Sequence, residues 1–113
     1  MTTRIFFNDT DVSEKYKKLK ESSNSKDVLI LKEINKAIDK LAKDPFLGIQ
    51  IPKRQIPKDY TRIFKPDNLW KYDLDRSWRL IYWISSDDEG RITILIDWMN
   101  HKQYDKLFGY STS

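Results

Sequence analysis

The fold is decided by the stretch from Asn68 to Tyr110, NLWKYDLDRSWRLIYWISSDDEGRITILIDWMNHKQYDKLFGY. Apolar and aromatic residues recur there at alternate positions, which is typical of β-strands whose side chains point to two faces in turn. Asp87-Asp88-Glu89-Gly90 interrupts the pattern with turn-forming residues. We therefore predict three consecutive antiparallel strands followed by a short helix, over residues 68–73, 77–85, 91–98 and 102–108.

One face of this sheet is expected to be apolar and to form the core, and the other to be mixed and open. A two-residue loop between the first two strands would pair Tyr72 with Arg79 and bring a cation into the core, so a loop with an odd number of residues is expected. The core face is predicted to carry Trp70, Tyr72, Trp78, Leu80, Tyr82, Ile84, Ile92, Ile94 and Ile96, and the open face Leu69, Lys71, Asp73, Arg79, Ile81, Trp83, Thr93, Leu95 and Asp97.

Two cations are expected side by side on the open face. The odd loop sets Lys71 beside Arg79, and like charges directly opposite each other destabilise a sheet. An anionic ligand held between them would compensate for that repulsion. Alternatively, Asp73 and Asp97 neutralise the pair, and the cluster is a surface network of ion pairs.

The first half of the chain predicts a strand and two helices. Residues 4–7 form a short outer strand, a helix capped within residues 9–11 runs to Glu21, and a second helix runs from Lys26 to Lys43 and ends at Asp44-Pro45. We expect the two helices to form a hairpin on the apolar face. The second helix is predicted to bury the stripe Val28, Leu31, Ile34, Ile38 and Leu41, widened by Ile30, Ala37 and Ala42.

Residues 44–67 show little regular pattern and contain all four prolines of the chain. Basic residues alternate there with Tyr60 and Phe64, a mixture that suits single-stranded nucleic acid through phosphate contacts and base stacking. The other interpretation is a surface loop that the aromatics attach to the core. The candidate RNA-binding residues are Lys53, Arg54, Lys58, Arg62 and Lys65.

Composition describes one domain over residues 1–113, and its positive net charge suggests a polyanionic partner, although many small basic proteins have none. The chain has 34% charged residues, a net charge of +4, no cysteine and one histidine, which argues against disulfides, a zinc site and a membrane span. The first residues show no signal-peptide pattern, so the cytoplasm is the expected location. Phosphate-binding glycine loops and clustered metal-ligating carboxylates are missing from the sequence, so we expect neither cofactor nor metal.

NLWKYDL, WRLIYWI and NHKQYDKLFGY resemble the RelE branch of the RelE/ParE toxins of toxin–antitoxin systems. The resemblance runs from Gly48 to Tyr110, and its most specific part is the strand arginine followed by a His-Lys pair after the next strand. It implies an α+β fold of order β-α-α-β-β-β, in which a two-helix hairpin packs on a small antiparallel sheet, with a short C-terminal helix. It also implies a toxin that cuts messenger RNA on the ribosome without metal, through attack of a ribose 2′-hydroxyl on the adjacent phosphate. The implied partner is an antitoxin protein.

Carried over by position, the resemblance gives Arg79 the contact with the scissile phosphate and Lys71 the role of a strand lysine. His101 and Lys102 fall on the family's basic or histidine pair. His101 is the candidate base or acid, because an ordinary imidazole titrates near neutral pH. Tyr104, or alternatively Tyr110, takes the place of the family's C-terminal tyrosine. His101, Tyr104 and Asp105 are spaced to share one side of the last helix.

One departure from the family pattern is Asp73, which stands where a second lysine is expected and weakens the predicted phosphate site. Two alternatives therefore remain: a ParE-like toxin that inhibits DNA gyrase by binding, and an RNA-binding relative with weak or no catalysis. The antitoxin is expected to dock on the open face and to cover part of the Lys71–Arg79 region. The apolar residues predicted to receive it are Leu69, Ile81, Trp83 and Leu95.

Overall fold

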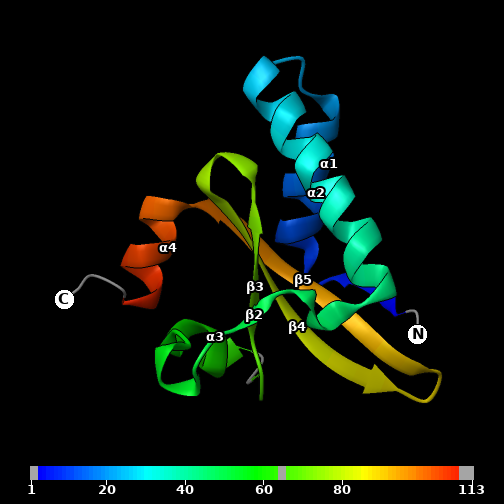
Figure 1. Cartoon of the computed structure of the whole chain (residues 1–113), viewed down its shortest axis with the longest axis vertical. Coiled ribbons are helices and arrows are strands. Elements are labelled where there is room, and N and C mark those ends of the chain that lie inside the picture. The colour runs from blue at the N-terminus through cyan, green and yellow to red at the C-terminus, as the bar shows by residue number, and fades with distance from the viewer. Residues whose placement is uncertain (1–2, 64–65, 110–113) are drawn as a thin grey trace.

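The protein has an α+β fold built on one five-stranded mixed sheet (Figure 1). The computed structural model describes residues 3–63 and 66–109. The strands lie in the order β1-β5-β4-β3-β2. Among the described strands only the β1–β5 pair is parallel, so the expectation of an antiparallel sheet is wrong for β1. They are β1 (Arg4–Phe7), β2 (Ile49–Gln50), β3 (Trp70–Leu74), β4 (Trp78–Asp87) and β5 (Gly90–Asn100). The helices are α1 (Thr10–Glu21), α2 (Ser25–Lys43), α3 (Lys58–Ile63) and α4 (His101–Phe108), with 3-10 turns η1 (Pro45–Leu47), η2 (Lys53–Gln55) and η3 (Asp75–Ser77).

The predicted elements are present, and the connection between α2 and β3 adds β2, α3 and the 3-10 turns η1 and η2, which the sequence did not predict. β2 pairs with β3 through only two residues, which is too short for an alternating pattern. α3 is a helix of six residues, less than two turns. Within the described ranges, no helix is both long and apolar enough to cross a membrane.

Side-chain caps fix where the two long helices begin. The Asp9 carboxylate accepts from the backbone N–H of Val12 at 3.0 Å. The Asn24 side chain does the same for Lys26 at 2.9 Å. These bonds satisfy donors that the first helical turn leaves unpaired. The caps confirm the predicted helix starts to within a residue, and Asp44 ends α2 as expected.

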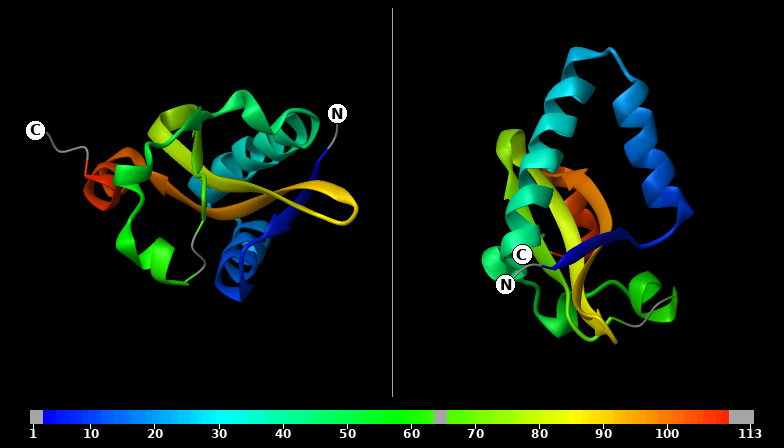
Figure 2. Two further views of the ribbon diagram at one scale, coloured as in Figure 1. Left: turned by 90° about the horizontal axis from the view of Figure 1, so that it is seen from below. Right: turned by 90° about the vertical axis from the view of Figure 1, so that its right-hand side faces the viewer.

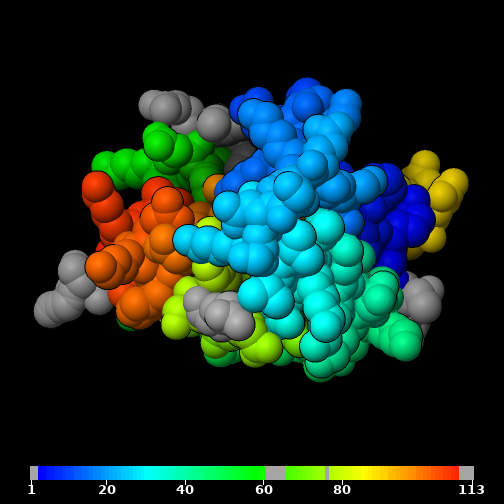
Figure 3. Space-filling model, turned by 90° about the horizontal axis from the view of Figure 1, so that it is seen from above, coloured from blue at the N-terminus to red at the C-terminus, as the bar shows by residue number. Residues whose placement is uncertain are grey.

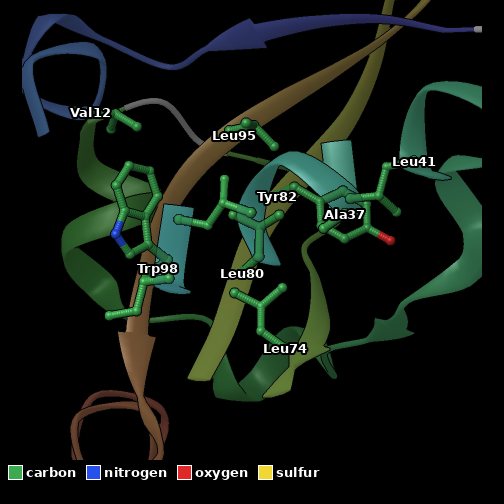
Figure 4. Packing of buried hydrophobic residues seen from close by; sticks show 10 residues of the cluster. Val12, Ala37, Leu41, Leu74, Leu80, Tyr82, Leu95 and Trp98 are labelled. Atoms are coloured by element: carbon green, nitrogen blue, oxygen red, sulfur yellow. The ribbon is translucent and has the colours of Figure 1, made fainter. Parts of the chain in front are cut away.

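The α1–α2 hairpin packs on one face of the sheet and forms the first core (Figures 1 and 4). The predicted stripe of α2 is wrong at its first residue, because Val28 is 48% exposed while Ile30 is buried. The helix therefore presents a face centred on Ile34 and Leu41. The buried members of this core are Val12, Ile30, Ile34, Ala37, Leu41, Leu74, Leu80, Tyr82, Leu95 and Trp98.

A β-bulge in β5 changes which residues of that strand face the helices. Ile81 pairs with Asp97, whereas the next residue of β4, Tyr82, pairs with Leu95, so Ile96 is the extra residue. The prediction that Ile92, Ile94 and Ile96 share the core face with Tyr82 is therefore wrong. The tight Asp87–Gly90 turn also sets the register between the turn and the bulge. Odd-numbered residues of β5 pair there with even-numbered residues of β4, so they face the α1–α2 hairpin.

The face expected to be open is covered by a second core. α4, η2 and α3 close over it, on the side of the strands opposite the helical hairpin (Figures 1 and 2). Leu69 and Ile81 are fully buried there, and Leu95 is fully buried in the first core, so these residues do not form the predicted docking surface. Buried members of this second core are Ile51, Leu69, Ile81, Ile96, Met99, Tyr104 and Phe108.

Trp83, the remaining residue of the predicted docking surface, is half-buried at the margin of the second core. Its indole N–H donates to the Asp67 carboxylate at 3.2 Å. That hydrogen bond holds the pKa of Asp67 below its usual range. The ring therefore links the segment before β3 to β4.

Tyr82 ties the first core to the connection after α2, and its replacement tests that link. Its hydroxyl donates to the Pro45 carbonyl at 2.6 Å and accepts from the Gly48 N–H at 3.1 Å. We expect Tyr82→Phe to lower the free energy of unfolding by about 1–2 kcal/mol, because both backbone groups lose their partner.

The same variant predicts a change in pH dependence. Burial raises the pKa of Tyr82 to about 12 from 10.0, so the folded state favours the neutral phenol. This contribution is complete below the unfolded pKa and is lost as the pH rises through the folded pKa. Urea unfolding at about pH 7 and about pH 11 should show a steeper alkaline loss for wild type than for Tyr82→Phe. Tyr72→Phe is the control and should lose as much unfolding free energy at high pH as wild type. An equal alkaline loss in wild type and Tyr82→Phe would contradict the assignment to Tyr82.

Candidate functional site

The residues predicted to act on a phosphate come together where β3 and β4 meet the beginning of α4. Lys71 lies on β3, Arg79 on β4, and His101 and Tyr104 on α4. The loop between β3 and β4 has three residues, the odd number that the sequence predicts. This loop length places Arg79 on the face of the sheet that carries the second core, and not on the face that packs against the α1–α2 hairpin.

The Tyr104 ring is the platform of this cluster. The Lys71 ammonium lies 5.2 Å and the Arg79 guanidinium carbon 5.3 Å from the ring centroid, both within cation–π range. Tyr104 is 1% exposed and stacks on Phe108 with centroids 4.5 Å apart. Its hydroxyl oxygen is also buried, so in this structure the side chain supports the two cations and does not face solvent.

The pairing of the two cations differs from the prediction. Lys71 stands directly opposite Ile81, and Arg79 directly opposite Asp73, so the cations are diagonal neighbours. The Arg79 Nε atom and the Asp73 carboxylate are 3.6 Å apart. The diagonal placement, the shared Tyr104 ring and the Asp73 carboxylate beside Arg79 reduce the repulsion that direct opposition would cause.

The alternative of a neutralising network is correct for Asp73 and wrong for Asp97. Asp97 pairs with Lys15 of α1 at 2.6 Å, away from the cluster. Lys15 also donates to the Trp98 carbonyl at 2.8 Å. This ion pair therefore attaches α1 to the end of β5, and it leaves Asp73 as the carboxylate that competes with a ligand for Arg79.

His101 is the first residue of α4, and a capping box fixes its position. The Asn100 side chain accepts from the Gln103 N–H at 2.9 Å, and the Gln103 side chain accepts from the Asn100 N–H at 3.2 Å. His101 Nδ1 lies 3.4 Å from Arg79 Nη2, and its Nε2 lies 3.1 Å from the Asp105 carboxylate. Both ring nitrogens therefore have charged neighbours.

The cluster offers anion binding, proton transfer and access from solvent. The His101 side chain is 53% exposed, whereas that of Arg79 is only 18% exposed. A half-exposed imidazole beside a largely buried guanidinium can accept a proton from a molecule that the guanidinium holds. No group of three potential metal ligands occurs among residues 3–63 and 66–109.

The predicted RNA-binding cations are spread over the connection and α4. Lys53 and Arg54 are exposed on η2, Lys58 is exposed at the start of α3, and Lys102 is exposed on α4. Arg54 and residues 107–109 line one hollow of about 400 Å³, so η2 lies beside the end of α4. Arg62 lies in α3, but its side chain is not among those described. Lys65 and Tyr110 lie outside the described residues.

Tyr60 attaches this connection to the body. Its ring meets Phe108 edge to face at 6.0 Å, and burial raises the pKa of its phenol. For Tyr60 the structure thus matches the alternative in which an aromatic residue anchors the loop. Phe64, the other aromatic of that pattern, lies outside the described residues.

A separate hollow of about 490 Å³ lies between α1, the end of β5 and α4. Its lining includes Lys15, Trp98, Lys106 and Leu107, and none of the four predicted catalytic residues. In Figure 3 the orange-red α4 stands next to the blue and cyan hairpin on this side of the molecule. This hollow is therefore a different place from the cluster around Arg79.

Asp73→Asn tests whether Asp73 limits anion binding at Arg79. Because the Asp73 carboxylate is more than half exposed, its pair with Arg79 is worth at most about 1 kcal/mol. We therefore expect the affinity for inorganic phosphate to rise roughly two- to fivefold. The measurement is an NMR titration that follows the side-chain Nε–Hε signal of Arg79. Asp75→Asn, the same charge change on the exposed η3 turn, is the control. An equal rise in both variants would mean that net charge alone is responsible.

Comparisons with models of known protein families, with curated proteins and with solved structures found no match to this chain. The evidence for function is therefore the chemistry of its residues and their arrangement in the fold.

Proposed function

We propose that the protein is a RelE-like toxin, a metal-independent endoribonuclease that cuts messenger RNA on the ribosome and so inhibits translation. The observation that supports this most directly is the contact of Arg79 with His101 at 3.4 Å, on the platform that Lys71 shares. A phosphate-binding cation next to a proton acceptor is what cleavage by a ribose 2′-hydroxyl requires. The sequence resemblance supplies the substrate class.

In the proposed reaction His101 takes the proton of the 2′-hydroxyl. The 2′-oxygen bonds to the adjacent phosphorus, and the bond from phosphorus to the 5′-oxygen breaks. Arg79 and Lys71 stabilise the negative charge that gathers on the phosphate oxygens. Lys71 is also the candidate acid, because its ammonium can give a proton to the departing 5′-oxygen, whereas a guanidinium does not lose its proton in proteins.

The exposed cations of η2, α3 and α4 would hold the RNA on either side of this phosphate. Lys53, Arg54 and Lys58 precede the cluster in the chain, and Lys102 follows His101 directly. Phosphate contacts of this type give affinity without sequence specificity. The proposal also includes an antitoxin partner, which the resemblance implies, but its docking surface is not the buried set Leu69, Ile81 and Leu95.

A second candidate, an RNA-binding relative with weak or no cleavage, is favoured by the Arg79–Asp73 ion pair. In the resting cluster the carboxylate occupies one side of the guanidinium at 3.6 Å. A phosphate must displace it before charge stabilisation begins. Binding that relies on Lys53, Arg54 and Lys58 would persist in such a protein even if the step at phosphorus were slow.

The function is tested by induced expression combined with primer extension on a translated reporter message. We expect growth arrest and cuts in phase with codons for wild type. Arg79→Gln, which removes the charge but keeps part of the aliphatic stem, and His101→Ala should reduce cutting by roughly 100-fold or more, the usual loss for such groups. Lys32→Ala, on the exposed surface of α2, should cut like wild type.

Other outcomes assign the chain differently. Growth arrest without cuts would point to a target such as gyrase and would contradict cleavage. Bound but intact message, with folded protein confirmed by circular dichroism, would support the RNA-binding relative. Cuts on untranslated message would show that the ribosome is not required.

A further inference from the structure

The contacts of His101 define which of its nitrogens carries the proton in the neutral ring. Arg79 has only donors, so the ring atom that it approaches at 3.4 Å, Nδ1, must be the acceptor. The remaining nitrogen, Nε2, then carries the hydrogen, and it faces the Asp105 carboxylate at 3.1 Å. A carboxylate accepts hydrogen bonds, so the two contacts agree on the same tautomer.

We infer that Asp105 is a positioning residue that holds His101 as the Nε2–H tautomer, with Nδ1 as the proton acceptor. Helical spacing makes this contact possible, since residues i and i+4 of α4 lie on one side. The Asp105 side chain is about one third exposed, which leaves it partly shielded at this contact. The role of the tautomer in catalysis rests on the proposed function, but the tautomer itself does not.

Arg79 in turn covers the accepting nitrogen in the resting protein. Its guanidinium contacts Nδ1 on one side and the Asp73 carboxylate on the other. A phosphate that binds Arg79 replaces these partners with its own oxygens. Its two charge-assisted hydrogen bonds to the guanidinium are stronger than the contact with Nδ1 or the contact with the Asp73 carboxylate. Substrate binding therefore uncovers Nδ1 beside the bound phosphate, where the 2′-hydroxyl also lies.

In the proposed reaction the proton of the 2′-hydroxyl goes to Nδ1 and stays there, while Asp105 keeps the ring in place through Nε2. Nδ1 takes the hydrogen of the 2′-hydroxyl, the 2′-oxygen attacks phosphorus, and the 5′-oxygen leaves with a proton from Lys71. The imidazolium that forms has N–H groups on both nitrogens, and Asp105 stabilises its charge through Nε2. Asp73 lies on β3 against Arg79, so it acts on the guanidinium instead of the imidazole.

The tautomer is measurable without any activity, because His101 is the single histidine of the chain. Long-range ¹H–¹⁵N spectra, recorded about two pH units above the ordinary imidazole pKa of about 6.5, identify the protonated nitrogen. We expect Nε2–H for wild type. In Asp105→Ala the Nε2–H to Nδ1–H ratio should fall roughly two- to tenfold, the effect of one lost hydrogen bond. Asp105→Glu should restore part of it, and Asp39→Ala, an exposed carboxylate on α2, should change nothing.

A 2′-O-methyl RNA oligonucleotide tests the uncovering of Nδ1. It cannot be cleaved at that sugar, and its binding should shift the Nδ1 signal of wild type while leaving the Nε2 assignment in place. An unchanged tautomer ratio in Asp105→Ala, in protein whose remaining spectrum matches wild type, would overturn the role of Asp105. If the ratio falls in Asp105→Ala but the wild-type protein cuts no RNA, the proposed function is wrong and the positioning contact still stands.

Discussion

The bulge at Ile96 is the constraint on which the rest of the structure depends. In a regular strand, Leu95 and Trp98 would point to opposite faces, because they are three positions apart. Both are nevertheless buried in the first core, under the helical hairpin, while Ile96 and Met99 belong to the second core. The extra residue lets one strand supply both cores. It also sets the phase in which β5 ends at Asn100, and therefore where α4 and His101 begin.

A sheet covered on both faces places unusual demands on its charged residues. Arg79 faces the second core, and its side chain is 18% exposed. The guanidinium is accommodated by the Tyr104 ring, the Asp73 carboxylate and His101 together. Cation–π contacts gain strength as they lose water, to roughly 2 kcal/mol for desolvated pairs. The aromatic pair Tyr104–Phe108 therefore packs α4 against the sheet and also holds the cations in place.

The elements that alternate or repeat over many residues were predictable from the sequence. Caps at Asp9 and Asn24, the turn at Asp87–Gly90 and the odd loop before Trp78 follow from local chemistry. The meeting of Lys71, Arg79 and His101 followed from the strand order. The faces of β5 did not, because the tight pairing of Asp87 with Gly90 sets them before the bulge, and the bulge itself leaves no mark in a row of isoleucines and leucines. The cover formed by α3 and η2 was also missed, since a short helix among prolines has no periodicity to detect.

The cluster around Arg79 and the exposed cations elsewhere on the surface differ in their balance of charge. Within the cluster, Lys71 and Arg79 are matched by Asp73 and Asp105, so it carries little net charge when His101 is neutral. Lys53, Arg54, Lys58 and Lys102 are exposed elsewhere, on η2, α3 and α4. Long-range attraction of a polyanion depends on exposed positive charge, whereas a balanced cluster discriminates by geometry at short range. An RNA drawn to the connection and α4 would engage Arg79 only where a phosphate fits well enough to displace Asp73. Under the proposed function, Asp73 would restrict which phosphate is attacked, and the surrounding lysines and arginine would determine how often RNA arrives.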